Sequence, residues 1–163
     1  MDVLTAIKER RSIRKFKSKA LSRAELENIA DAGRLAATAR NVQPWEFIAV
    51  TDKTALSKLA AITDYGKFLK ESAAAIVVFC EDTKYYLEDG SAATQNMLVA
   101  AAGLGIGSCW IAGDKKAYAS AVAELFNVPA KYKLVSIIAL GYPDAKSSVA
   151  KRELASVLHW EKF

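Results

Sequence analysis

Short apolar segments alternate with helical patterns along this chain of 163 residues. The segments of strand length are 45–51, 74–80, 108–111 and 133–140. The spacing of apolar residues predicts helices at residues 3–7, 22–36, 52 to 60 or 61, 89–104 and 115–126. This alternation predicts a sheet with helices on both faces, and it leaves the directions of the strands open.

Capping signals support three of these helix ends. Ser22-Arg-Ala-Glu25 has the pattern of a capping box, and Asp52 is placed to cap the next helix. Glycines at 103, 105 and 107 follow the long small-residue helix and predict its end. These glycines do not form a dinucleotide-binding loop, because that loop follows a strand and precedes a helix, which is the reverse order.

The length of the chain matches one domain, residues 1–163, at roughly 100–200 residues per domain. The longest compact apolar run, Ala73 to Cys80, is far shorter than the ~20 residues of a membrane span. The N-terminus lacks a signal-peptide core, so we expect a cytoplasmic protein with no membrane association. Two cysteines and one histidine, His159, provide too few ligands for a Cys/His metal site.

Positive charge is concentrated at the N-terminus. Residues 1–23 contain eight basic and two acidic side chains, whereas the rest of the chain has a net charge of −1. Such a segment predicts an anionic partner: a nucleic acid, a phosphorylated cofactor or a membrane surface. Phe16 is the only aromatic residue in the segment, so stacking on nucleic-acid bases has little support and that alternative is disfavoured.

Two motifs carry candidate binding residues. In Glu9-Arg-Arg-Ser-Ile-Arg-Lys-Phe16, arginine forks suit phosphate and the serine adds a neutral donor. If this segment is extended, Arg10 and Ser12 alternate with Arg11 and Ile13. In Arg40-Asn-Val-Gln-Pro-Trp-Glu-Phe47, a polar pair leads into a strand. Taken alone, the first motif is more typical of a solvated basic patch, and the second is compatible with a turn that carries an aromatic core anchor.

Together the two motifs resemble the nitroreductase family of FMN-dependent oxidoreductases. That family has R-R-S-x-R-x-F near its N-terminus and A-P-S-x-x-N-x-Q-P-W-x-F in its second motif. Three further segments agree in the same order: 103–111, 140–143 and 151–160. The resemblance therefore covers nearly the whole chain.

The resemblance implies an α+β fold in which a mostly antiparallel sheet lies between helices. It also implies an intertwined homodimer with FMN at the interface, and a C-terminal tail that crosses to the other subunit. The implied reaction transfers hydride from NAD(P)H through FMN to nitroaromatic, quinone or similar acceptors by a ping-pong mechanism. FMN carries this chemistry, so no catalytic side chain and no metal are implied. An alternative is a flavin-binding or storage protein without efficient turnover.

The resemblance also assigns site residues by position. Arg10, Arg11 and Ser12 match the positions that hold the FMN phosphate and ribityl chain, and Arg14 matches the basic position at the flavin's pyrimidine edge. The other matching positions are Asn41 from the partner subunit near the isoalloxazine, the backbone of Trp110, Ile111 and Ala112 along the flavin, and Lys151 and Arg152 at the phosphate.

One motif departs from the family. Ala37-Thr38 replaces the usual Pro-Ser, and Thr38 preserves the hydroxyl. The chain also lacks a long insertion between residues 52 and 92, which larger members use as a lid. One hypothesis is an open pocket over the flavin, formed around residues 65–68, with broad selectivity for acceptors. The equally weighted alternative is that these residues only cap a helix on the surface.

Overall fold

A computed structural model of the chain describes residues 1–145, 147 and 149–163. The helices are α1 (Val3–Glu9), α2 (Arg23–Arg34), α3 (Lys53–Ile62), α4 (Tyr86–Gly103) and α5 (Ala119–Leu125). The strands are β1 (Trp45–Val50), β2 (Ala74–Glu81), β3 (Gly107–Ala112) and β4 (Tyr132–Gly141). Short 3-10 turns are η1 (Ala39–Asn41), η2 (Lys67–Glu71) and η3 (Leu154–Ser156).

The predicted elements are present, and two helices begin elsewhere than expected. Helix α4 begins at Tyr86 instead of residue 89, and α5 begins at Ala119 instead of residue 115. The start of α5 is displaced because Lys115 adopts a positive φ of 54°, which a right-handed helix does not accept. The capping box at Ser22 and Glu25 and the cap at Asp52 are both formed.

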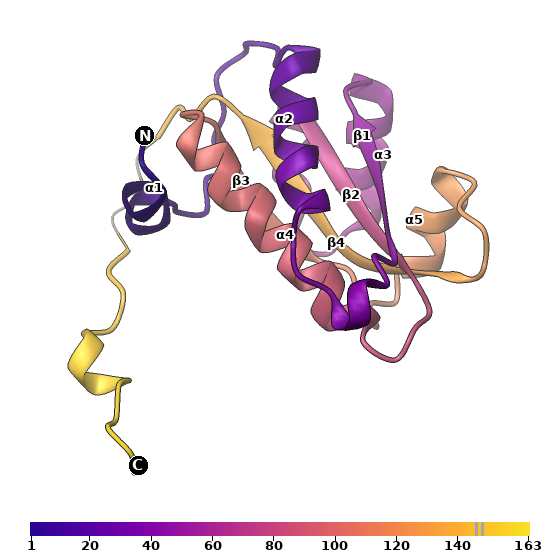
Figure 1. The fold of residues 1–163 in the computed structure, drawn as a ribbon. Helices are drawn as coiled ribbons and strands as arrows, with labels where there is room; N and C mark the ends of the chain where they lie inside the picture. The colour runs from indigo at the N-terminus through magenta and orange to yellow at the C-terminus, as the bar shows by residue number, and fades with distance from the viewer. Residues whose placement is uncertain (146, 148) are drawn as a thin grey trace.

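The four strands form one sheet in the order β1-β2-β4-β3, and every pairing is antiparallel (Figure 1). The antiparallel sheet implied by the resemblance is confirmed, whereas the alternation of elements alone left strand direction open. Strand β4, the last in the sequence, lies inside the sheet between β2 and β3. Strands β1 and β3 are the two edges.

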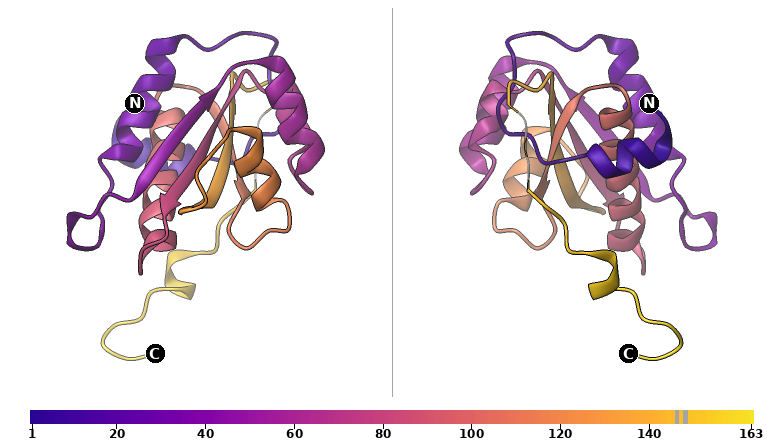
Figure 2. Two further views of the ribbon diagram at one scale, coloured as in Figure 1. Left: turned by 90° about the vertical axis from the view of Figure 1, so that its right-hand side faces the viewer. Right: turned by 90° about the vertical axis from the view of Figure 1, so that its left-hand side faces the viewer.

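Helices cover both faces of the sheet, as Figure 2 shows. Helices α2 and α4 pack on the face that receives Ile76 and Val78 of β2, and α1 packs against α4. Helices α3 and α5 pack on the opposite face, which receives Val77 and Phe79. Successive β2 side chains therefore enter different layers of the core, which explains why β2 is apolar at nearly every position.

A β-bulge interrupts the pairing of β2 with β4. Val78 pairs with Ser136 and Phe79 with Leu134, so Val135 is the extra residue. The Val135 carbonyl accepts hydrogen bonds from the amides of Gly113 and Asp114, at 3.0 and 3.3 Å. The bulge therefore fixes the turn that leaves β3.

The C-terminal tail extends away from the body of the molecule (Figures 1 and 2). Its apolar side chains Leu154 and Trp160 are 68% and 77% exposed. Val3 and Leu4 on α1 are similarly exposed. No helix in the described part of the chain combines the length and apolar composition that crossing a bilayer requires.

A side-chain hydrogen bond joins the start of α2 to the residue after β4. The Tyr142 hydroxyl donates to Glu25 at 2.6 Å, and this bond, with those from Ser22, lowers the pKa of Glu25 to about 2. Deprotonated Glu25 therefore stabilises the folded state above its usual pKa of 4.5, and this stabilisation is lost as the pH falls from 4.5 towards about 2.

We expect Tyr142→Phe to reduce the free energy of unfolding at pH 7 by about 1 kcal/mol or less, because the pair is partly solvated. The difference from the parent chain should shrink as the pH is lowered towards 3. Urea unfolding of the variant and the parent chain at several pH values measures this difference in the free energy of unfolding. An equal loss at every pH would show that Tyr142 acts through packing alone.

Candidate functional site

The basic segment that follows α1 is extended and runs along the outer edge of β3. Ser12 forms a parallel bridge with Ser108, and the amide of Ile13 donates to the Ser108 carbonyl at 2.9 Å. Further on, the amide of Lys17 donates to the Tyr142 carbonyl at 2.9 Å. The backbone of this segment is therefore fixed against the sheet, which sets the direction of each side chain.

Arg10, Ser12 and Arg14 influence one common neighbour, the Cys109 thiol of β3. Burial raises the pKa of Cys109, while the charge of Arg14, hydrogen bonding to Ser12 and the charge of Arg10 oppose the rise. The charges of Arg14 and Arg10 therefore both act on this thiol. Arg10 also lines, together with Arg11 and Ile13, a cavity at the end of α1.

A cavity of about 350 Å³ lies beside Arg14 and the end of β3. Trp110, Ile111 and Ala112 line it, together with the aromatic rings of Tyr65 and Phe68. The guanidinium carbon of Arg14 lies 5.9 Å from the centre of the Phe68 ring, within the range of a cation–π contact. The structure thus brings six of the predicted residues to one place, whereas Gly66 and Lys67 do not line this cavity.

Lys116 and Tyr118 also line this cavity, and sequence analysis did not identify them. They lie in the turn that follows β3, which the sequence pattern assigned to a helix. The Tyr118 hydroxyl donates to the Ala112 carbonyl, which ties this turn to the end of the strand. The signal that could have indicated them is their position immediately after a strand that carries predicted site residues.

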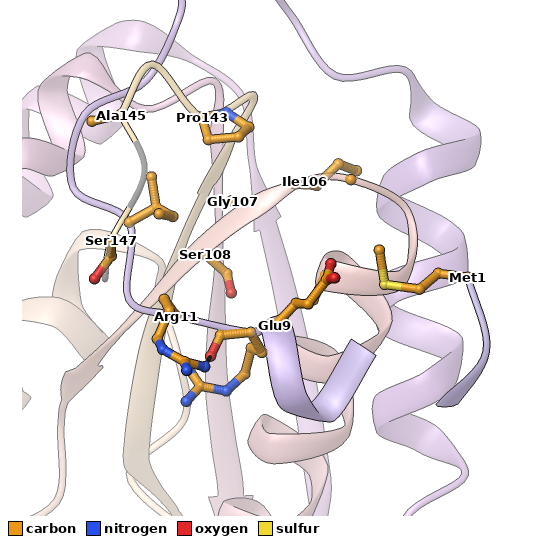
Figure 3. Close-up of a pocket in the computed structure, with 13 residues that line it drawn as sticks. Met1, Glu9, Arg11, Ile106, Gly107, Ser108, Pro143, Ala145 and Ser147 are labelled. Carbon is orange, nitrogen blue, oxygen red and sulfur yellow. Dashed lines mark hydrogen bonds between the residues drawn. The ribbon is translucent and has the colours of Figure 1, made fainter. Parts of the chain in front are cut away.

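Arg11 lines a second cavity, of about 450 Å³, between α1 and the start of β3. Figure 3 shows Arg11, Ser108 and Ser147 around this cavity. The Arg11 guanidinium donates to the carbonyls of Lys8 and Arg10, at 2.7 and 2.8 Å, and to that of Val149 at 3.0 Å. In this chain Arg11 therefore joins the end of α1 to the beginning of the tail.

Gly107 allows the basic segment to approach β3 closely. A Cβ at this position would lie 3.0 Å from Ile13 and 3.2 Å from the Gly141 carbonyl oxygen, both tighter than ordinary contacts. The absence of a side chain therefore lets Ile13, and with it Ser12, lie against the strand.

We expect Gly107→Ala to destabilise the fold by roughly 1–3 kcal/mol and to displace Ser12 from its position beside Cys109. Chemical unfolding measures the first effect. Gly103→Ala is the matched control, because its new Cβ would meet nothing closer than Ala6 at 3.9 Å. If both variants unfold like the parent chain, Gly107 is not required for the close approach.

Thr38 and Asn41 lie in a separate group at the turn η1 before β1. Strand β1 is the edge of the sheet opposite to β3, so this turn is not beside Arg14 or Trp110. Arg40, Asn41 and Gln43 all have positive φ values, between 51° and 56°. Such a backbone is strained, and strained turns are frequent at binding sites.

Contacts within the chain hold the η1 turn in place. The buried carboxylate of Asp89 accepts a hydrogen bond from the amide of Ala39 at 3.0 Å. The Thr38 hydroxyl accepts from the amide of Gln43 at 3.4 Å, so the hydroxyl that replaces the family's serine is used inside the turn. Asp89 lies in the first turn of α4, and through this hydrogen bond it also anchors the η1 turn.

Lys151 and Arg152 form a third group, in the exposed tail. Arg152 donates to the Ser156 carbonyl at 2.7 Å, a contact within the tail itself. Within a single chain, Lys151 and Arg152 do not lie beside Arg10, Ser12 and Arg14. The predicted site residues are therefore divided among the edge of β3, the η1 turn and the tail.

Comparisons with known proteins agree with this fold. The sequence profile of the nitroreductase family matches residues 7–85 and 81–142. A protein of Archaeoglobus fulgidus, provisionally named an NADH dehydrogenase/NAD(P)H nitroreductase, is 39% identical over 87% of this chain and 86% of its own length.

Two solved structures are also similar along nearly their whole length. An FMN-dependent nitroreductase from Clostridium difficile has a TM-score of 0.92 and 32% identity, covering 98% of this chain and 99% of that one. A protein from Desulfovibrio desulfuricans, provisionally named a nitroreductase and solved in complex with FMN, has a TM-score of 0.88 and 32% identity, covering 100% and 98%. With this fold and these matches, the chain belongs to the nitroreductase family.

Proposed function

We propose that the chain is an NAD(P)H-dependent oxidoreductase that binds FMN beside the outer edge of β3. The observation that carries this proposal is the position of the basic segment against the start of β3, where Arg14 lines a cavity with Trp110 and Ala112 and Arg10 lines a second cavity with Ser108. The FMN named for two structural relatives and the NAD(P)H named for the Archaeoglobus relative support the same assignment.

The chemistry of these residues fits FMN. Arginine side chains and a serine hydroxyl suit a phosphate and the hydroxyls of a ribityl chain. Within the residues described, no strand pairs with the outer edge of β3 beyond Ser108, so backbone groups there are available to a planar heterocycle. Phe68 and Trp110 add apolar surface at the same cavity.

When bound, FMN supplies the two-electron chemistry between NAD(P)H and an acceptor such as a nitroaromatic or a quinone. In this proposal the residues of the chain bind the flavin and orient it. The positive charge of Arg14 favours negative charge on its neighbour, and the edge of β3 holds the plane of the ring. Because one cavity serves the nicotinamide and the acceptor in turn, we expect ping-pong kinetics.

We further propose that the site is completed by a second copy of the chain. Asn41 and the pair Lys151 and Arg152 lie away from the β3 edge in one copy, so a partner must supply them if they contact the same FMN. Exposed apolar side chains on α1 and the tail provide the surface for such a dimer. Each copy contributes one domain, because the single sheet includes strands from both halves of the chain.

The first test is the visible absorption spectrum of purified protein that has been incubated with FMN and desalted. Retained flavin at about one per chain supports the proposal, and a folded but colourless protein contradicts it. Oxidation of NADH and NADPH by the loaded protein, with a panel of acceptors, then separates an enzyme from a flavin-storage protein. Turnover is expected with several acceptors, because Tyr65 in the lining of the cavity beside Arg14 is 85% exposed and leaves that side accessible.

A further inference from the structure

Lys17 and Lys19 belong to the basic N-terminal segment but take no part in the proposed flavin site. They follow Phe16, at the point where the segment leaves β3 and crosses towards α2. Here they line a cavity of about 570 Å³. This cavity shares no lining residue with the cavities at Arg14 and Arg11. The excess positive charge of the segment is thus divided between two places.

Lysines from three separate segments line this cavity. Lys53 at the start of α3 and Lys70 in η2 join Lys17 and Lys19, and Glu71 is the only acidic residue in the lining. None of the four lysines has a carboxylate within 4.0 Å among the residues that the structure describes. Four lysines and one glutamate in the same lining give the cavity a positive net charge, which favours an anionic ligand.

Two of the four ammonium groups are held by neighbouring atoms. Lys53 donates to the Ser72 carbonyl at 2.6 Å, and Lys19 lies 3.9 Å from the centre of the Tyr142 ring. Lys17 and Lys70 make no side-chain hydrogen bond within the described ranges, and both are exposed. The cavity therefore combines two oriented cations with two that can move to meet a ligand.

We infer that this cavity binds a compact anion with several phosphates, such as the diphosphate or triphosphate group of a small molecule. An ammonium group binds phosphate oxygens as a point charge, and four of them match an anion that carries several charges in a small volume. The cavity volume lies in the usual range for small-molecule sites, roughly 300–1,000 Å³. Phe16 and Leu21 give it an apolar wall for the rest of such a molecule.

A nucleic-acid strand fits these observations less well. Binding of single strands uses aromatic side chains on which successive bases stack. Phe16 is the only aromatic residue in the lining, it is half-buried, and its ring packs against Gly141. The lysines also surround one cavity and do not follow an extended groove.

The test is calorimetric titration of FMN-saturated protein with tripolyphosphate, at about 50 mM and about 300 mM NaCl. We expect one tripolyphosphate per chain, with affinity that falls as salt rises. The double variant Lys17→Gln, Lys70→Gln should raise the dissociation constant by about tenfold or more. It should fold normally, because neither side chain makes a described hydrogen bond or ion pair.

The matched control is Lys58→Gln, Lys84→Gln, which removes the same charge from exposed positions outside the described cavities. Its dissociation constant for tripolyphosphate should stay within about twofold of the parent value. Amide chemical shifts in the parent protein should change around residues 17–21, Lys53 and Lys70. Equal losses in the two double variants would show only unspecific attraction by net charge, and would overturn the inference.

Further outcomes also overturn it. If tripolyphosphate binds only in the absence of FMN, its site is the phosphate position beside Arg10. In protein without FMN, the Arg10→Ala variant is therefore expected to bind tripolyphosphate as tightly as the parent chain does. This comparison keeps the test independent of the proposed flavin site.

If a single-stranded oligonucleotide binds more tightly than tripolyphosphate and depends on the same lysines, the partner is a nucleic acid. Absence of any binding heat and any shift change would exclude the site.

Discussion

Replacement of Arg10 by alanine is expected to weaken FMN binding by roughly 10- to 100-fold. A hydrogen bond to a charged group contributes about 1.5–3 kcal/mol, and each 1.4 kcal/mol corresponds to a factor of about ten in affinity. The fold should be preserved, because the contact of Arg10 with α1 is made by its backbone amide, which donates to the Ala6 carbonyl at 2.9 Å. Quenching of flavin fluorescence during titration measures the affinity.

Arg23→Ala is the matched control for this experiment. The Arg23 side chain is 91% exposed and pairs only with Glu27, so its removal should leave FMN affinity unchanged and cost little stability. Arg10→Lys should recover part of the affinity, since it restores the charge without the planar fork. Unchanged affinity in Arg10→Ala would place the FMN phosphate elsewhere and would contradict the proposed site.

A chain that ends at Ala150 is expected to lose both dimerisation and FMN. Truncation removes the exposed apolar residues of the tail, whose burial in the proposed dimer would contribute roughly 1.5–3 kcal/mol for each large side chain. It also removes Lys151 and Arg152. Sedimentation should show a monomer at micromolar concentration, and desalting should leave the truncated protein colourless.

A second variant separates the two effects of the tail. Lys151→Gln, Arg152→Gln keeps the apolar residues Leu154 and Trp160, so it should remain dimeric while binding FMN more weakly. Conversely, Trp160→Ser should weaken the dimer without touching the predicted phosphate contacts. A truncated chain that remains dimeric and yellow would show that the tail is unnecessary and that the exposed surface of α1 is sufficient.

Local patterns in the sequence predicted the helices and strands well where their side chains are deeply buried. Strand β2 is buried on both faces, so its apolar run stands out in the sequence, and the capping box at Ser22 marks the start of α2. The start of α5 was missed because a positive φ at Lys115 and a tertiary contact of Tyr118 decide it. Strand order and direction depend on long-range pairing, which no local pattern encodes; family resemblance supplied the direction.

The candidate site was predictable only in part for a related reason. The basic segment and the end of β3 both stood out in the sequence, and the structure places Arg14 and Trp110 in the lining of one cavity. The carbonyls that Arg11 binds come from the end of α1 and from Val149, far away in the chain, and so could not be inferred. The contact of Asp89 with the η1 turn could not be predicted, because its partner, the amide of Ala39, is a backbone group that carries no sequence signal.

The central position of β4 has a consequence for the order of folding during synthesis. Strands β2 and β3 are translated before β4 and do not pair with each other; β2 can pair with β1, whereas β3 has no partner strand until β4 is made. Until residues 132–141 leave the ribosome, one edge of β2 and the whole of β3 stay unpaired and open to aggregation. The contact of Phe16 with Pro143 closes later still. The nascent chain therefore has no intermediate with a complete sheet, and we expect its yield to depend on chaperones that hold it until the last strand inserts.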